Sequence, residues 1–403
     1  MLLYMAALLS TAAHAQSAKY YYFYAQQNEK VVCDVVSETD RTASITSKVV
    51  TRYKDDNFLK VQWTVTVQQP VSGDYVLPSE VNLRFFDALY NIDRPVGRYT
   101  IVAIGNEGFK GCSKLRSITI PASVRNVSNN VFDGCTMLET INLPSTTENF
   151  DISGLANLKS LKAINVESGA NGRYSSFSGI LCKEKELVFC PVGFQGSVHI
   201  PSSVNTIRQD AFRGCDGITD VIVDDGLSSI NSSAFLNCSM LKKVVLPNTV
   251  TDIGVSAFKG CLMLESVSLG TRVKTIKTSV FEDCSLLKEI VLPGSIGVVG
   301  GSAFKNCFSL EKIVFGEGIK EICPEAFSFC SSLREIDFPS TLVEIGSQAF
   351  MGCESLTRVR LPQQLKEIGR YAFMGCSSLT DINVPNNTKV YDETFLDCIN
   401  LKQ

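Results

Sequence analysis

The chain has 403 residues, of which 45% are hydrophobic and 20% are charged, and its formal net charge is -3. This composition is that of a folded protein, built either as two or three ordinary domains or as one long repetitive domain. It contains no basic tract of the kind that binds nucleic acid and no acidic tail that would indicate disorder.

The first 15 residues have the pattern of a secretory signal peptide. A short apolar run from Leu2 to Leu9 precedes Ala13-His14-Ala15, which fits the small-residue pattern of a cleavage site. The usual Lys or Arg before the apolar run is absent, and the alternative interpretation is a buried N-terminal helix. No later apolar run approaches the about 18 residues that a membrane-spanning helix needs. We therefore expect residues 1–15 to be removed and the protein to be secreted or held at the cell surface.

Residues 16–98 are predicted to form a small β-rich cap. The segments 20–36, 42–53 and 59–70 are rich in β-branched and aromatic residues with partial alternation, as strands are. A repeat protein must shield its first unit from solvent, and a cap of this kind would do so.

From Cys112 onward, cysteines recur at a regular spacing. The spacing is 23 residues, apart from a last step of 22 and a gap of 80 between Cys135 and Cys215, in which Leu158 occupies the expected position. We call the cysteines at this spacing the regular cysteines: Cys112, Cys135, Cys215, Cys238, Cys261, Cys284, Cys307, Cys330, Cys353, Cys376 and Cys398. A period in the twenties with Leu and Ile at fixed offsets predicts a leucine-rich repeat solenoid over residues 99–403, with a parallel β ladder on one face.

One repeat illustrates the predicted coil. Ile336 and Phe338 are two residues apart and would share one face of a short strand, which Pro339 ends because it has no N–H. Gly346 follows at a bend, where we expect a positive φ angle, and glycines recur at this place in other repeats. A phenylalanine precedes each regular cysteine by three residues, and these rings are predicted to stack into a buried spine.

The repeat is interrupted at about residues 167–200. This segment contains two apolar stretches, Ile180–Cys182 and Leu187–Cys190, on either side of charged residues 183–186. We expect a hairpin that decorates one coil of the solenoid, after which the repeat resumes.

Three stretches resemble a known family. The phrase A-F-x-x-C-x-x-L-x-x-I-x-L-P-x-x-L-x-x-I-G recurs along the chain, GILCKEKELVFCPVG resembles the hairpin insertion of that family, and YTIVAIGNEGFKGC resembles its first repeat. The family is that of the BspA-like, or Treponema-type, leucine-rich repeat proteins. The resemblance implies a surface or secreted protein of the kind found in mouth and gut bacteria and in some parasitic protozoa. It also implies attachment to host matrix proteins such as fibronectin and fibrinogen, or contact with other cells.

The regular cysteines admit three interpretations. A zinc site needs clustered thiolates or histidines, but the chain has no C-x-x-C motif and, after cleavage, only His199. Disulfides between coils fit poorly, because stacked side chains about 4.8 Å apart exceed the Cβ separation of a relaxed bridge. Leu158 replaces a cysteine at one of the regular positions, where it could form neither a disulfide nor a metal site. This favours the third interpretation, a small buried thiol that fills an inner corner of the coil. We therefore expect no metal and no cofactor, and Cys182–Cys190 remains a possible bridge in the hairpin.

The sequence gives no pattern typical of an enzyme. A serine or cysteine triad needs a histidine base, and His199 lies between Val198 and Ile200 in a phase that points it outward. No glycine-rich phosphate loop follows a strand, and the carboxylates occupy scattered repeat positions. We expect no catalytic residues.

Binding would then use the outward positions of the strand ladder. The residue seven past each cysteine position lies between two core residues and is predicted to face solvent. This column is the candidate ligand-binding site: His199, Ile222, Val245, Ser268, Val291, Val314, Asp337, Arg360 and Asn383. Its four β-branched apolar residues would form a docking stripe. The alternative is that β-branched residues only suit strands.

A neighbouring column, five past each cysteine, alternates in charge. It consists of Asp220, Lys243, Ser266, Glu289, Lys312, Glu335, Arg358 and Asp381. We interpret it as structural, because cross-strand charge pairs stabilise the register of adjacent strands.

These observations predict an exported, non-enzymatic interaction protein that binds a protein ligand, such as a host matrix or cell-surface protein, and no nucleic acid. The alternative function is a structural one, in which solenoids assemble into a surface layer or filament. Carbohydrate binding is disfavoured for the strand face, because that face offers few aromatic side chains.

Overall fold

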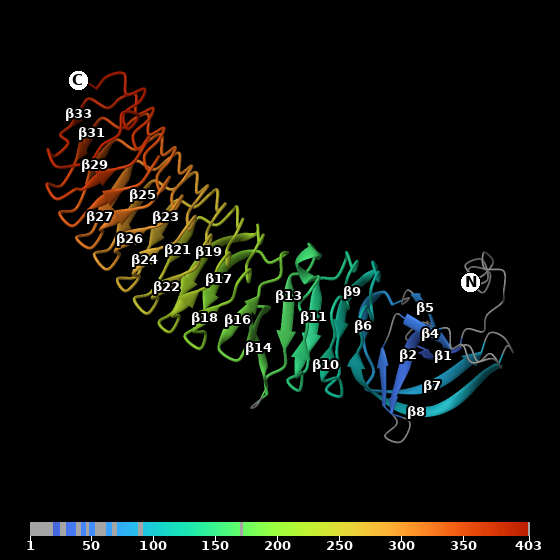
Figure 1. Cartoon of the computed structure of the whole chain (residues 1–403). Coiled ribbons are helices and arrows are strands. Elements are labelled where there is room, and N and C mark those ends of the chain that lie inside the picture. Colours follow the sequence, from blue (N-terminus) through green and yellow to red (C-terminus); the bar gives the residue numbers. More distant parts are fainter. Residues whose placement is uncertain are drawn as a thin grey trace, which may run out of the picture. The chain divides into compact units, whose positions relative to one another are not determined.

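The structure is a computed structural model that describes residues 19–24, 30–37, 42–45, 48–52, 62–66, 71–87, 92–169 and 172–401. The predicted signal peptide, residues 1–15, lies outside the described residues. The chain divides into two compact units, residues 1–179 and 180–403. In the described part of both units, nearly all the regular secondary structure is β-strand, and turns connect the short strands (Figure 1).

Unit 1 begins with a mixed sheet in the order β12-β10-β8-β3-β2-β1-β7. Its pairs β1–β2, β1–β7 and β7–β8 are antiparallel. The strands are β1 (Lys19–Tyr24), β2 (Lys30–Ser37), β3 (Thr42–Ile45), β7 (Glu80–Asp87), β8 (Ile92–Ile104), β10 (Asn126–Val127) and β12 (Asn149–Phe150), with a separate hairpin of β4 (Lys48–Arg52) and β5 (Gln62–Thr66).

The same unit contains the first parallel ladder, in the order β13-β11-β9-β6. Its strands are β6 (Gly73–Val76), β9 (Leu115–Thr119), β11 (Thr140–Leu143) and β13 (Ala163–Val166). The ladder therefore includes a strand from the segment before residue 99. Tyr75 of β6 is buried and its ring meets the ring of Phe109 edge-on at 6.1 Å. A short 3-10 helix, η2 (Leu155–Asn157), and β14 (Tyr174–Phe177) complete the unit.

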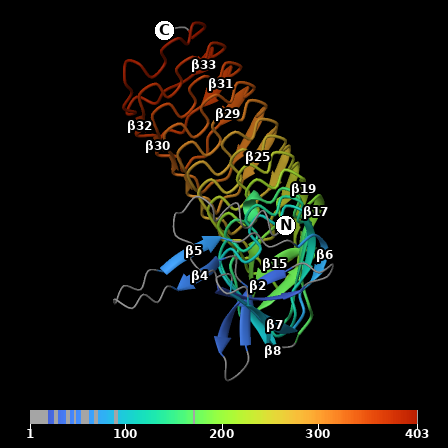
Figure 2. The same ribbon diagram turned by 90° about the vertical axis from the view of Figure 1, so that its right-hand side faces the viewer.

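Unit 2 begins with an antiparallel hairpin of β15 (Ile180–Lys183) and β16 (Glu186–Phe189). Coils of about 23 residues follow. Each has a first strand of two to six residues, and all but the last have a second strand of two residues; the two sets of strands lie on separate sides of the unit (Figure 2). The first strands are β17 (Gly196–Ile200), β19 (Ile218–Val223), β21 (Lys243–Val245), β23 (Ser266–Ser268), β25 (Glu289–Leu292), β27 (Lys312–Phe315), β29 (Glu335–Asp337), β31 (Arg358–Arg360) and β33 (Asp381–Ile382). The second strands are β18 (Thr206–Ile207), β20 (Ser229–Ile230), β22 (Asp252–Ile253), β24 (Thr275–Ile276), β26 (Val298–Val299), β28 (Glu321–Ile322), β30 (Glu344–Ile345) and β32 (Glu367–Ile368).

A spine of stacked phenylalanine rings runs through the core of unit 2. From Phe212 to Phe395, the ring centroids of neighbouring coils lie between 4.6 Å and 5.7 Å apart. The rings from Phe212 to Phe373 are completely buried, whereas Phe395 is partly exposed. Burying each ring contributes roughly 1.5–3 kcal/mol, and no single coil could bury its ring without the next.

The regular cysteines have a specific structural role beside this spine. Nine of these eleven thiols donate a hydrogen bond to the carbonyl of the phenylalanine in the preceding coil, with Sγ···O distances of 3.0 to 3.4 Å, whereas Cys215 lies 3.6 Å from the Cys190 carbonyl oxygen. The donors are Cys135, Cys238, Cys261, Cys284, Cys307, Cys330, Cys353, Cys376 and Cys398. That carbonyl already accepts the backbone N–H of the cysteine in its own coil, so the thiol occupies its second lone pair. Every cysteine whose side chain is described is a free thiol, including Cys182 and Cys190 of the hairpin.

The prediction for the repeated glycines was wrong. Gly346 and its counterpart Gly369 do not have positive φ angles; the positive values fall two residues later, at Gln348 and Tyr371. A Cβ atom at Gly346 would lie 2.6 Å from the backbone nitrogen of Pro324 in the preceding coil. Glycine is needed here because two coils approach closely, a requirement that local turn geometry does not reveal.

Candidate functional site on the strand face

The first strands of the coils in unit 2 alternate between core and solvent. In β21, buried Val244 lies between exposed Lys243 and Val245, and β29 repeats the pattern around Ile336. This is the period of two that a pleated strand imposes on a sheet with one buried face. The outward residues therefore form columns across the coils, and we call this surface the strand face.

All nine residues of the predicted column are exposed. Strand register places His199, Ile222, Val245 and Ser268 side by side in successive coils. It also pairs Val291 with Val314, and Asp337 with Arg360, whereas Asn383 directly follows β33. The sequence thus identified which residues reach this surface, although their role in binding stays a prediction.

The apolar members of the column form two pairs. Ile222 and Val245 are 51% and 39% exposed, and Val291 and Val314 are 52% and 38% exposed. Exposed Ser268 lies between these pairs. Because clustered apolar side chains on a surface often mark an interaction site, these four residues are the centre of the candidate site.

Polar contacts flank the apolar centre. His199 Nε2 lies 2.7 Å from Asp224 Oδ1 at one end, and Arg360 Nε lies 3.5 Å from Asp337 Oδ1 at the other. Both pairs are exposed, and such pairs contribute about 0–1 kcal/mol to stability. A polar rim around an apolar centre is the usual composition of a protein-binding surface.

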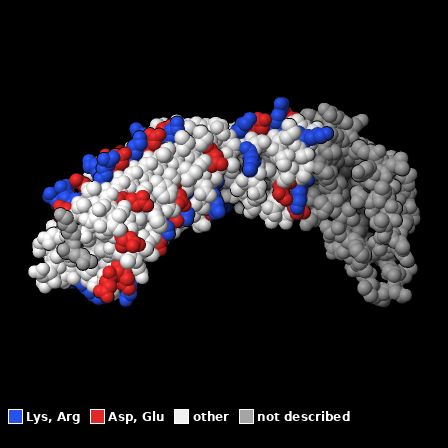
Figure 3. Space-filling model, turned by 90° about the horizontal axis from the view of Figure 1, so that it is seen from above, with Lys and Arg blue, Asp and Glu red and all other residues white. Residues whose placement is uncertain are grey.

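The charge column beside the site forms ion pairs between coils. Lys312 Nζ lies 3.1 Å from Glu289 Oε1, and Arg358 pairs with Glu335. On the face that Figure 3 shows, basic and acidic residues are interspersed along the described surface and do not gather by sign. The ion pairs of the charge column present both charge signs within a short distance, and the paired charges largely neutralise each other.

The buried thiols are poorly suited to chemistry. Desolvation raises the pKa of Cys353 to about 12, and it raises the pKa of Cys182 to the same value. Thiolates, the reactive form, are therefore scarce at neutral pH. Within the described residues, His, Cys, Asp and Glu side chains form no group of three arranged to hold a metal ion. In that same part of the chain, no helix has the length and apolarity to cross a bilayer.

Sequence reasoning missed a second surface, at the turns after the cysteines. Met240, Leu262, Leu286 and Phe308 occupy these turns in four successive coils, and all four side chains are exposed. They lie one or two residues past the cysteine, where the repeat has no fixed residue type. The one signal in the sequence was that Leu262 and Phe308 stand directly after a cysteine, where several other coils have Ser.

The parallel ladder, the buried leucines and the 23-residue coil define a leucine-rich repeat solenoid protein. Residues 80–192, 185–310 and 297–403 match the family model described as BspA type leucine rich repeat region, and the chain belongs to this family. The predicted resemblance and the predicted fold are thus confirmed.

Solved structures share this fold. A leucine-rich repeat protein from Bacteroides ovatus is 24% identical, with a TM-score of 0.61, and the match covers 89% of this chain and 92% of that one. A leucine-rich repeat protein from Eubacterium ventriosum is 17% identical, with a TM-score of 0.51 and coverages of 83% and 95%. The search of curated proteins gave no match.

Family membership indicates a class of function. Leucine-rich repeat proteins of this type are scaffolds for protein interaction and generally lack enzymatic activity, and their surface location is typical of the family. Membership of this family therefore indicates a role in protein interaction.

Proposed function

We propose that the chain is an exported, non-enzymatic protein that binds a protein ligand at the strand face of unit 2, through Ile222, Val245, Val291 and Val314. The ligand class is an extracellular protein, either a host matrix protein or a protein of another cell surface. The observation that carries the proposal is the exposure of two in-register apolar pairs on a face otherwise lined by polar residues.

The chemistry of this face favours a protein over other partners. Burying partly exposed Val and Ile side chains against an apolar patch gains roughly 25 cal/mol per Å² removed from water. The flanking ion pairs at Asp337–Arg360 and Glu289–Lys312 offer both charge signs to a partner within a short distance. Such alternation favours a surface of complementary pattern over a uniform polyanion.

The test is a pull-down with the purified protein as bait against extracellular matrix and cell-surface protein fractions. The double variant Val291→Asp/Val314→Asp places two carboxylates where the partner would exclude water, so we expect capture to be lost. Val255→Asp is the matched control, because Val255 is also exposed, at 42%, but lies in a turn outside the strand face. Equal capture by all three proteins would reject the strand face as the site.

Assembly into a layer or filament is the competing function. Light scattering of the purified protein separates the two, because a binding protein stays a small species at rising concentration, whereas an assembling one grows. Growth that Val291→Asp/Val314→Asp abolishes would assign the strand face to self-association.

A further inference from the structure

A shallow groove of about 540 Å³ crosses successive coils of unit 2 at the turns beside the cysteine column. We call it the turn groove. Its lining consists of Asp216, Asn237, Ser239, Gly260, Leu262, Asp283, Ser285, Asn306 and Phe308. These residues lie directly before or after a buried cysteine, and none belongs to the outward column of the strand face.

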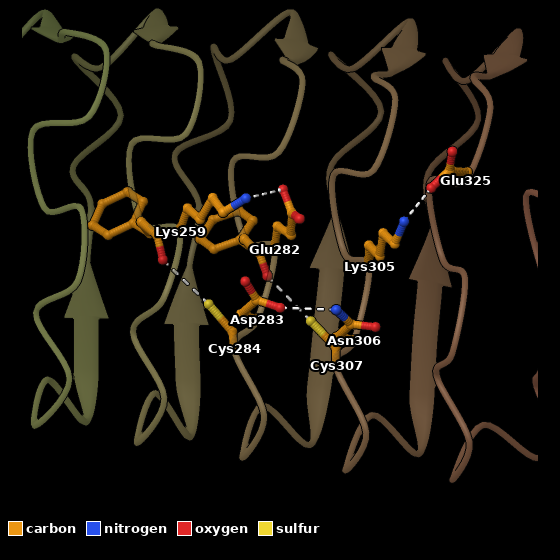
Figure 4. Close-up of polar contacts among 10 residues, drawn as sticks. Lys259, Glu282, Asp283, Cys284, Lys305, Asn306, Cys307 and Glu325 are labelled. Carbon is orange, nitrogen blue, oxygen red and sulfur yellow. Dashed lines mark hydrogen bonds and ion pairs between the residues drawn. The ribbon is translucent and has the colours of Figure 1, made fainter.

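Polar side chains line the groove and are held in place by hydrogen bonds between coils. Asn306 Nδ2 donates a hydrogen bond to Asp283 Oδ1 at 2.8 Å, and Figure 4 shows the two side chains next to each other beside Cys284 and Cys307. Ser239 Oγ donates to Asp216 Oδ1 at 2.9 Å. Each bond engages one oxygen of a carboxylate that can accept through two. The side chains are therefore oriented, with acceptor capacity left for a ligand.

Apolar surface completes the groove. Phe308 and Leu262 are 48% and 47% exposed, although side chains of this size are usually buried. Gly260 has no side chain to fill the space, and a Cβ there would lie 2.3 Å from Asn237 Oδ1. The groove thus combines an exposed aromatic ring with hydrogen-bonding groups repeated from coil to coil.

Two features argue against a peptide or an acidic polymer as the ligand. The backbone N–H groups of Asn237 and Asp283 already donate to the backbone carbonyls of Lys259 and Lys305 in the next coils, so they cannot pair with an extended peptide. The lining contains no Lys or Arg, and its two aspartates would repel a sulfated or uronic chain.

We propose that the turn groove is a binding site for a linear neutral oligosaccharide. Asp216, Asp283 and Asn306 would hydrogen-bond to sugar hydroxyls, and Phe308 would pack on the C–H face of one pyranose ring, whose polarised C–H groups meet the negative face of the aromatic ring. The groups recur at the coil spacing of about 4.8 Å, which is close to the length of one sugar unit in an extended chain. This site lies at a different place from the strand face and would bind a different class of ligand, so the two proposals are tested independently of each other.

The experiment is a calorimetric titration of the full chain with neutral hexasaccharides of the cello, manno, laminari and malto series, and with a heparin hexasaccharide. We expect at least one neutral hexasaccharide to bind and the heparin fragment not to bind. Phe308→Ala and Asp283→Ala should each weaken that binding about tenfold or more, since each removes a direct ligand contact.

Two matched controls occupy the same repeat positions in a coil outside the groove. Ile399→Ala corresponds to Phe308, and Asp397→Ala corresponds to Asp283. Both should keep the affinity of the unmodified protein, as should Val291→Asp/Val314→Asp. The proposal is overturned if no neutral hexasaccharide binds at millimolar concentration, if only the heparin fragment binds, or if the groove variants bind like the controls.

Discussion

Removing one ring from the buried phenylalanine spine should strongly destabilise unit 2. Phe304 is completely buried and stacks between Phe281, at 5.3 Å, and Phe327, at 5.0 Å. Phe304→Ala removes a full ring and leaves a cavity between two coils that the stacked rings on either side hold open. A substitution of this kind costs about 3–5 kcal/mol, a large share of the about 5–15 kcal/mol that stabilises a typical protein.

The solenoid geometry adds a second expected effect. Each coil contacts only its neighbours, so a weakened interface in the middle of unit 2 can uncouple the coils on either side. We expect urea unfolding of Phe304→Ala, followed by circular dichroism, to shift to lower denaturant and to broaden or split. Phe395→Ala is the comparison, because Phe395 is partly exposed and stacks on Phe373 at 5.7 Å; its loss should be smaller. Equal, small shifts below about 1 kcal/mol for both variants would refute the stacked-spine account.

Two further predictions concern the glycine and the cysteine of the repeat. Gly346→Ala should destabilise unit 2 by about 1–3 kcal/mol in thermal unfolding, because its Cβ would meet the Pro324 nitrogen. Gly297→Ala is the control and should be neutral, since a Cβ there has open space around it. Equal melting temperatures for the two variants would contradict the close approach of the coils at Gly346. Burial raises the pKa of Cys353 from 9.0 to about 12, so the neutral thiol favours the folded state and this stability is lost as the pH rises from about 9 towards 12. The loss of stability at alkaline pH should therefore be smaller in Cys353→Ala than in the unmodified protein. The thiols of the native protein should also resist alkylation until it is denatured, and rapid labelling of the native thiols would contradict their burial.

Much of the coil could be predicted from the sequence, because its determinants are local and repeated. The alternation around Ile336 fixes which residues of a strand face solvent, and a 23-residue period places the same position of each coil in one column. For this reason the exposure of His199 and Val291 follows from counting alone.

Features that depend on contacts between coils could not be predicted. Gly346 has the place of a bend residue in the sequence, but its requirement comes from the backbone of Pro324 in the coil before. The hydrogen bond that most of the regular cysteines donate to the preceding Phe carbonyl, such as that of Cys307 to Phe281, likewise joins two coils. The turn groove was missed because Asp283 and Asn306 are 23 residues apart and become one surface only after stacking.

Binding of a protein ligand at the strand face of unit 2 is best tested by measuring the affinity of the captured ligand. Biolayer interferometry with immobilised ligand should give a Kd at least tenfold weaker for Val291→Asp/Val314→Asp, since the loss of a hot-spot residue at the centre of an interface costs about 2 kcal/mol or more, about thirtyfold. Val255→Asp should bind like the unmodified protein. A single Kd shared by all three proteins would contradict binding at the strand face.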